Sequence, residues 1–179
     1  MWLVLLLGAL ATVTAIIAAP FAVATGHAFI AQQIYQTFSH LCHQIPARSF
    51  FVHDHPLAVC ARCTGIYSGF ALATLIYPLT RSLRNTRTPE RKWLLVAAAL
   101  LAIDVGLDLL GVWQNTHTTR VLTGLLLGGV AVFYVVPGLV ELSLRDWRAA
   151  KTVARPSTPT LTTTTSTAPS DYSAPHRRI

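Results

Sequence analysis

All three cysteines of this chain lie in one short stretch, together with several histidines. The stretch covers residues 41–65 of the 179-residue sequence. The possible ligands in it and just before it are Cys42, Cys60, Cys63, His40, His43, His53 and His55. Thiolates and imidazoles are the ligands that borderline-soft metals prefer, and a Cys-x-x-Cys pair is also the working unit of thiol–disulfide exchange. The stretch therefore indicates metal binding or redox chemistry.

Three interpretations of the cysteines stay open. In the first, Cys42, His43, Cys60 and Cys63 bind a transition metal, zinc before others, and one of the two later histidines could replace His43. In the second, Cys60 and Cys63 form a redox pair and Cys42 is a third, resolving thiol, while Arg62 between the pair favours the thiolate. In the third, one disulfide joins the loop to the next helix and one thiol is left over.

The composition indicates a membrane protein. Hydrophobic residues make up 53% of the chain and charged residues 12%, and the mean hydropathy is +0.50. A soluble domain carries about 25% charged residues. The pI of 9.9 could suggest nucleic acid, but the basic residues flank apolar segments and do not form a patch with interleaved aromatics. We expect membrane lipid and no nucleic acid among the partners; the sequence specifies no protein partner.

The hydropathy pattern predicts an all-α, polytopic membrane protein with four transmembrane helices and an outer amphipathic helix and loop. A span needs about 20 apolar residues, and the four candidates cover residues 2–25, 60–79, 93–113 and 121–142. They form a single membrane domain over residues 1–150, with an outer Cys/His segment at 26–63 and a disordered cytoplasmic tail at 151–179. The first segment lacks the basic start and is longer than the apolar core of a signal peptide, so we expect it to be a span.

The basic residues predict the orientation. Cytoplasmic loops of membrane proteins carry an excess of lysine and arginine. Two such clusters occur here: Arg81, Arg84, Arg87, Arg91 and Lys92, and then Arg145, Arg148, Lys151 and Arg155. Both should be cytoplasmic, which predicts a multi-pass protein of the cell membrane with both termini inside and the Cys/His segment extracytoplasmic.

Residues 27–41 have the apolar spacing of an amphipathic helix, carried by Ile30, Ile34, Phe38 and Leu41. This helix either continues the first span or lies at the membrane interface. Pro46 limits it, and residues 46–58 are expected to be irregular.

Small residues in the last span predict close helix packing. Gly124 and Gly128 have the small-xxx-small spacing that lets two helix backbones approach. We expect this contact to lie inside the four-helix unit.

Asp104 and Asp108 in the third span are four residues apart, so they should share one face of that helix. Both should lie in the outer part of the span, near the Cys/His segment. An acid at membrane depth is costly unless it is paired, and it often faces a cavity. We predict Asp104, Asp108, Arg62 and Arg120 as candidate catalytic residues, and a purely structural ion pair with either arginine is the alternative. Supporting roles are predicted for Gln44, Arg48, Thr64 and Thr123.

Two motifs carry a family resemblance: Cys42-His43-Gln44 with Arg48-Ser49-Phe50, and Cys60-Ala61-Arg62-Cys63-Thr64-Gly65. With Asp104, Asn115, Arg120 and Thr123-Gly124, the chain resembles small prokaryotic membrane proteins catalogued as domain of unknown function 2085. The resemblance implies a polytopic membrane protein and one common site, but no reaction.

A second resemblance is architectural. Four-helix membrane thiol oxidases that reduce quinone also place a Cys-x-x-Cys, with an arginine near it, at the outer start of a helix. They use two cysteine pairs, whereas this chain has three cysteines.

These observations predict an outer-face metal site, zinc or another transition metal, in a membrane protein. It would be an enzyme if Asp104 or Asp108 acts as a base or an extra ligand. The alternatives are a membrane thiol–disulfide oxidoreductase that uses Cys60, Cys63 and a quinone, and a small-solute transporter. The sequence contains no phosphate-binding glycine loop, no serine nucleophile elbow and no c-type haem motif.

Overall fold

The computed structural model describes residues 1–83, 87–112 and 115–153, with side chains to residue 144. Within these residues the chain forms five α-helices, one short 3-10 helix and one two-stranded hairpin. The helices are α1 (Trp2–Ala24), α2 (Ala28–Ser39), α3 (Ala61–Thr80), α4 (Arg91–Leu109) and α5 (His117–Val153). The remaining elements are η1 (Pro46–Arg48), β1 (Phe51–Val52) and β2 (His55–Pro56). The mostly helical class is confirmed. Residues 151–153, predicted as the start of a disordered tail, belong to α5, and the rest of that tail lies outside the described residues.

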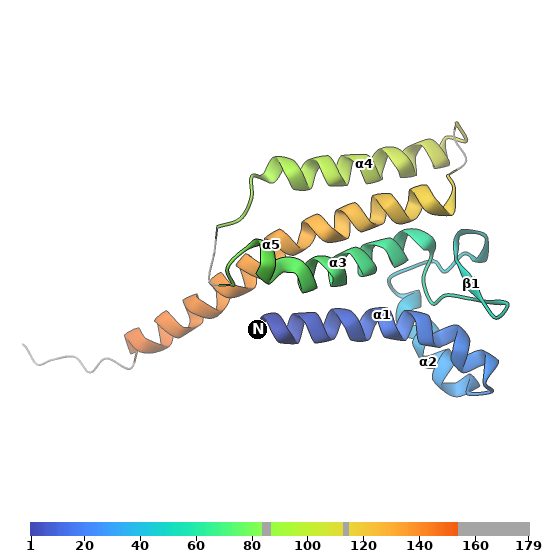
Figure 1. The fold of residues 1–179 in the computed structure, drawn as a ribbon, viewed down its shortest axis with the longest axis horizontal. Coiled ribbons are helices and arrows are strands. Elements are labelled where there is room, and N and C mark those ends of the chain that lie inside the picture. The colour runs from blue at the N-terminus through green and yellow to red at the C-terminus, as the bar shows by residue number, and fades with distance from the viewer. Residues whose placement is uncertain (84–86, 113–114, 154–179) are drawn as a thin grey trace, which may run out of the picture.

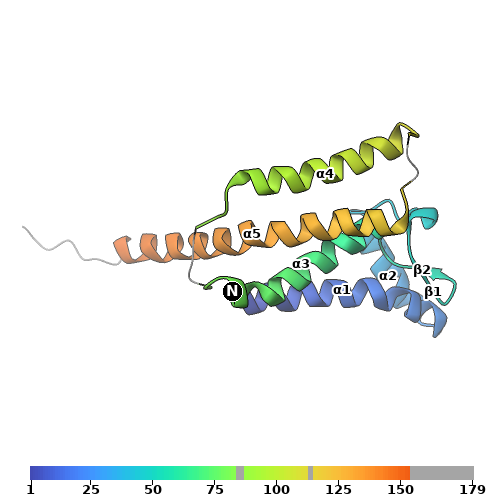
Figure 2. The same cartoon turned by 45° about the horizontal axis from the view of Figure 1, so that its top comes forward.

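The four long helices lie side by side in the order α1, α3, α5, α4 (Figures 1 and 2). Long helices that follow one another in the chain run in opposite directions, whereas the neighbours α3 and α5 run in the same direction. The N-terminus and the last turns of α5 therefore lie at one end of the molecule. The α2 helix, the hairpin, the end of α4 and the start of α5 lie at the opposite end, which we call the thiol end because Cys42, Cys60 and Cys63 lie there.

Two of the helices are long and apolar enough to cross a membrane: Trp2–Ala24 and, within α5, His117–Leu144. In the other two predicted spans the apolar pattern is interrupted. The α4 helix carries Arg91, Lys92, Asp104 and Asp108, and α3 contains many small and polar residues. Large apolar side chains nevertheless cover the outer surfaces of the helices: Leu79, Leu110 and Val4 are 86%, 75% and 73% exposed.

Glycines bring α3 and α5 into backbone contact. A Cβ atom on Gly65 or Gly69 of α3 would collide with the backbone of α5, and a Cβ atom on Gly124 or Gly128 of α5 would collide with the backbone of α3. Backbones approach this closely only where no side chain intervenes. The predicted packing role of Gly124 and Gly128 inside the helical unit is thus confirmed, and α3 supplies the matching glycine pair.

Two glycines end helices earlier than the hydropathy pattern predicts. Gly111 has φ +69°, Val112 N–H donates to Leu107 O, and Gly111 N–H donates to Asp108 O. This Schellman arrangement ends α4 at Leu109, four residues before the predicted limit of 113. Asp108 therefore belongs to the last turn of α4.

Gly26, with φ +82°, ends α1 in the same way. The amphipathic segment is consequently a separate helix, α2, that packs back against α1. Ala31 and Phe38 are its buried residues, whereas Ile30, expected on the apolar face, is 52% exposed.

An apolar cluster holds the thiol end together. Ile16 and Ala19 of α1 pack with Phe38 of α2 and with Leu57, Ala58 and Val59, the residues just before α3. Cys42 belongs to this cluster and is 7% exposed. The core therefore fixes the segments before and after the loop that carries the cysteines.

Candidate functional site

Three sulfur atoms converge at the thiol end. The Sγ atoms of Cys42, Cys60 and Cys63 all lie within 4.8 Å of one another, and all three cysteines are free thiols. Cys60 is the residue just before α3 and Cys63 lies in its first turn. The backbone N–H of Cys60 donates a hydrogen bond to Cys42 Sγ at 3.3 Å. The structure thus brings together three of the four predicted metal ligands.

Gln44 positions the Cys42 segment against the start of α3. Its Nε2 donates to the carbonyl of Tyr35 at 2.7 Å and to the carbonyl of Ala58 at 2.8 Å. One side chain therefore bridges α2 and the segment two residues before Cys60. Gln44 also has φ +50°, a left-handed backbone conformation two residues after Cys42.

Tyr35 makes a second bridge of the same kind. Its hydroxyl donates to the carbonyl of Pro56 at 2.5 Å. Burial raises the pKa of Tyr35 above its ordinary value, which keeps the hydroxyl protonated as the donor. This bond ties the hairpin to α2.

The histidines lie outside the sulfur cluster. Among the residues that the structure describes, the three cysteines are the only group of possible ligands gathered closely enough to hold a metal. His43 is exposed, although it lines the cavity beside the thiols. His53 and Asp54 form the hairpin turn with φ values of +49° and +62°, and the His53 ring packs on Phe21 at 5.2 Å. The role of His43 as a ligand remains a prediction.

Each predicted aspartate forms an ion pair with an arginine. Arg62 donates from Nε and Nη2 to Asp104 Oδ2 at 3.2 and 2.5 Å. Arg120 Nη2 donates to the two oxygens of Asp108 at 3.0 and 3.2 Å, and Arg48 lies 3.4 Å from the same carboxylate. These pairs join α3 to α4 and α5 to α4, so both acids support the packing of α4. A catalytic role for either acid remains a prediction.

Two predicted supporting residues bond only to their own helices. Thr64 Oγ1 donates to Cys60 O at 3.1 Å. Thr123 Oγ1 lies 3.0 Å from Thr119 O and 3.2 Å from Arg120 O. Neither threonine is among the residues that line the cavity beside the thiols.

A cavity of about 340 Å³ connects these features. Its lining includes all three cysteines and three arginines: Cys42, Cys60, Cys63, Arg48, Arg62 and Arg120. His43 and Gln44 also line it. Sequence reasoning identified these polar residues but missed two features that position them, the Gln44 bridge and the glycine pair on α3. The spacing of Gly65 and Gly69, four residues apart, was the available signal for the second.

Two uncharacterized proteins are similar to this chain over half of its length or more. The chain is 36% identical over 120 residues to an uncharacterized protein of Methanocaldococcus jannaschii, covering 67% of this chain and 77% of the relative. It is 34% identical over 100 residues to an uncharacterized protein of Methanothermobacter thermautotrophicus, covering 53% of this chain and 85% of the relative. No solved structure matches the chain significantly.

The family described as "Predicted membrane protein (DUF2085)" matches residues 42–134. The matched region begins at Cys42 and includes the other two cysteines, both aspartates and Arg120. With more than half of the chain matched, this protein belongs to the DUF2085 family of predicted membrane proteins.

Proposed function

We propose that this chain is a four-span membrane protein that binds a divalent transition metal, zinc in the first instance, through Cys42, Cys60 and Cys63. The observation that carries the proposal is the convergence of three Sγ atoms within 4.8 Å of one another. Around a tetrahedral zinc with Zn–S bonds of about 2.3 Å, neighbouring sulfurs lie about 3.8 Å apart. Small side-chain adjustments suffice to close the three thiols around an ion.

The charges around the cavity favour such a centre. Three thiolates and one divalent ion carry one net negative charge. The arginines at positions 48, 62 and 120 exceed the two aspartates by one positive charge. The neighbouring ion pairs therefore offset the charge of the metal–thiolate group, which lowers the cost of placing it in a half-buried site.

The fourth coordination position would face the cavity. Three protein ligands with an open position are characteristic of catalytic zinc sites, whereas structural sites are closed by four. His43 lines the cavity and could complete the coordination, or a water or substrate could take the position. A reaction at the metal would use this position, and Asp104 or Asp108 could act as a base only after leaving its arginine.

The proposed arrangement in the membrane uses all four long helices as spans. Apolar side chains on their outer faces would contact lipid, and the charged side chains of α4 at Asp104 and Asp108 turn to arginines within the protein. The start of α4, with Arg91 and Lys92, lies at the end of the molecule opposite the thiols. By the distribution of basic residues, that end and both termini are cytoplasmic and the Cys/His segment is extracytoplasmic. Residues 1–150 then act as one membrane domain.

Metal analysis of the purified full-length chain tests the proposal. We expect about one zinc per chain in the wild type, by the ligand count of the site. Cys60→Ser should lose most of it, while Ser68→Ala, further along α3 and outside the cluster, should retain it. A preparation whose three thiols are all reduced, yet which holds no zinc, iron or copper, would contradict the proposal.

The same sulfur geometry supports a second candidate, a thiol–disulfide oxidoreductase. Oxidation of Cys60 and Cys63 to one disulfide releases two electrons and two protons, which a quinone would accept to become a quinol. Cys42 lies close enough to attack that disulfide. Thiol trapping in intact cells separates the candidates: a Cys60–Cys63 disulfide that responds to quinone depletion supports the redox function, and three permanently free or metal-protected thiols exclude it.

A further inference from the structure

The cavity beside the thiols contains a buried donor that lacks an acceptor. Arg120 is 7% exposed, and its Nη2 is satisfied by Asp108. Its Nε atom is buried and has no hydrogen-bond partner. Buried donors are nearly always paired, and an unpaired charged donor is costly. Because Arg120 lines the cavity, a ligand there is the natural source of the missing acceptor oxygen.

The charge of the cavity favours an anionic ligand. Arg48 shares Asp108 with Arg120, so one carboxylate serves two guanidinium groups. The Arg48 side chain is 40% exposed, and its distance to the carboxylate is 3.4 Å. Arg48 can therefore turn toward a second anion without unfolding the site.

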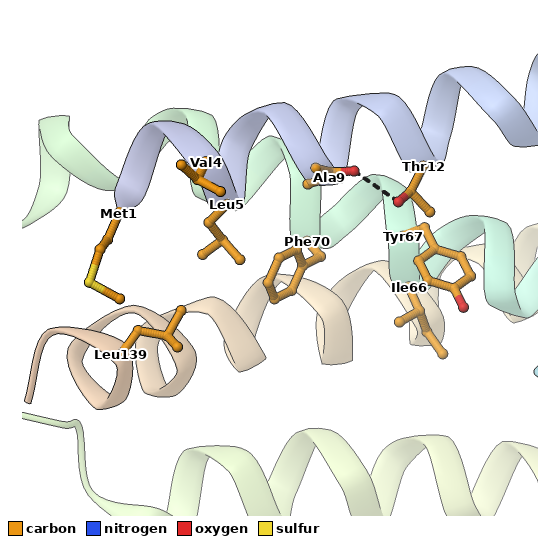
Figure 3. A pocket seen from close by; sticks show the side chains of 10 residues that line it. Met1, Val4, Leu5, Ala9, Thr12, Ile66, Tyr67, Phe70 and Leu139 are labelled. Carbon is orange, nitrogen blue, oxygen red and sulfur yellow. Dashed lines mark hydrogen bonds between the residues drawn. The ribbon is translucent and has the colours of Figure 1, made fainter. Parts of the chain in front are cut away.

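A long apolar groove begins next to this cavity. It has a volume of about 650 Å³ and lies between α1, α3 and α5. Figure 3 shows Ile66 and Tyr67 near one end and Met1 with Leu139 at the other, with Leu5 and Phe70 between them. From Met1 to Thr12, the lining residues of α1 extend over about 16 Å of helix.

Ile66 connects the two spaces, because it lines both the polar cavity and the apolar groove. The groove also opens outward, since Val4 and Gly8 in its lining are exposed. An arginine-lined cavity that shares a wall with a narrow apolar groove matches a molecule with an anionic head and a hydrocarbon chain.

We propose that this site binds an anionic lipid. Its head group, a phosphate or a carboxylate, lies in the cavity and accepts hydrogen bonds from Arg120 Nε and from Arg48. Its chain passes Ile66 and follows the groove between α1, α3 and α5. The proposal goes beyond the metal site, because no thiolate takes part in holding the lipid. The metal–thiolate group and the lipid head would share the one surplus arginine charge of the cavity, so the metal-free protein should bind the lipid at least as well.

Binding of simple amphiphiles to the full-length protein in a non-ionic detergent tests the proposal. Native mass spectrometry would count bound dodecyl phosphate, dodecanol and inorganic phosphate, each with and without a metal chelator. We expect dodecyl phosphate to bind at least about tenfold better than either other probe, since a charge-assisted hydrogen bond and a chain both contribute. Binding that persists after chelation separates this result from the outcome of the metal analysis.

Matched variants locate the two parts of the ligand. Gly8 lines the groove, and an added Cβ atom there meets no atom within 4 Å, so Gly8→Phe places a ring in the groove. Gly106→Phe places the same side chain on α4, where an added Cβ atom also meets no atom within 4 Å. The first should weaken dodecyl phosphate binding about fivefold or more and the second should not. Arg48→Gln should weaken it about tenfold while Arg48→Lys retains most of it.

Several outcomes would overturn the proposal. If dodecanol bound as tightly as dodecyl phosphate, the anionic head group would contribute nothing to binding and the proposal would be wrong. Inorganic phosphate binding as tightly as dodecyl phosphate would indicate a water-soluble anion and no lipid. Equal effects of Gly8→Phe and Gly106→Phe would show that the chain does not occupy the groove.

Discussion

Substitution of two adjacent glycines on α5 tests the close contact between α3 and α5. A Cβ atom on Gly128 would lie 2.9 Å from the carbonyl carbon of Ile66 and closer still to its oxygen. A Cβ atom on Gly129 would lie 3.9 Å from its nearest neighbours, which is ordinary van der Waals contact. Gly128→Ala should therefore force the helices apart, whereas Gly129→Ala should not.

The two substitutions should have different effects on the free energy of unfolding. Replacing glycine by alanine inside a helix stabilises it by up to about 1 kcal/mol, so Gly129→Ala should be neutral or stabilising. At Gly128 the same gain is opposed by overpacking, which typically costs about 1–3 kcal/mol and here acts against backbone atoms that cannot rotate away. We expect Gly128→Ala to be less stable than Gly129→Ala by about 1–3 kcal/mol.

Unfolding of the purified variants in mixed detergent micelles, followed by circular dichroism, would measure this difference. Zinc content per folded chain is a useful second readout. None of the three cysteines lies on α5, so Gly129→Ala should keep the metal content of the wild type. Gly128→Ala displaces α3 at Ile66, three residues from Cys63, and should lose part of the metal. Equal stability of the two variants would refute the close backbone approach of α3 and α5.

Three further predictions concern the thiol end and the ion pairs. Asp104→Asn leaves the half-buried Arg62 without its counter-charge and should lower the free energy of unfolding by about 3–5 kcal/mol. Glu90→Gln, in an exposed ion pair, should lower it by at most about 1 kcal/mol. Equal losses in denaturation curves would show that the inner pair is solvated. Gln44→Glu removes the amide that donates to two carbonyls. The zinc affinity, measured by chelator competition, should therefore fall about tenfold or more. An unchanged affinity would exclude Gln44 as a positioning residue. Asp54→Gly relieves a positive φ at the hairpin turn and should raise the unfolding free energy by about 0.5–1 kcal/mol; a loss would mean that the Asp54 side chain stabilises the turn.

The sequence predicted the broad fold because apolar runs are a local signal. The observed limits of α1, α3 and α2 lie within two residues of those expected for residues 2–25, 60–79 and 27–41. The end of α4 was missed because it depends on Gly111 adopting a left-handed conformation, and hydropathy carries no information on backbone angles. The hairpin at residues 51–56 was missed because its strands have two residues each, too short for any periodicity.

The site was predicted in part for a similar reason. The cysteines are few and lie in one stretch, so their types and spacing alone marked them as a group. Whether His43 joins them depends on side-chain direction, and neighbouring residues in a helical turn point about 100° apart. Cys42 is buried while its neighbour His43 is exposed, which composition could not indicate.

Hydropathy and residue types alone predict a helical protein whose thiol, carboxylate and guanidinium groups gather near one end of its helices. Which of these groups meet depends on how the helices pack against one another. Asp104 and Asp108 share a helix face and both arginines lie near it, so the pairing of Arg62 with Asp104 depends on how far α3 and α5 are displaced along α4. The glycine contact fixes how far α3 and α5 are displaced relative to each other, and the Gln44 bridge brings Cys42 to the start of α3. Both contacts join residues far apart in the chain, where local patterns carry no information on distance.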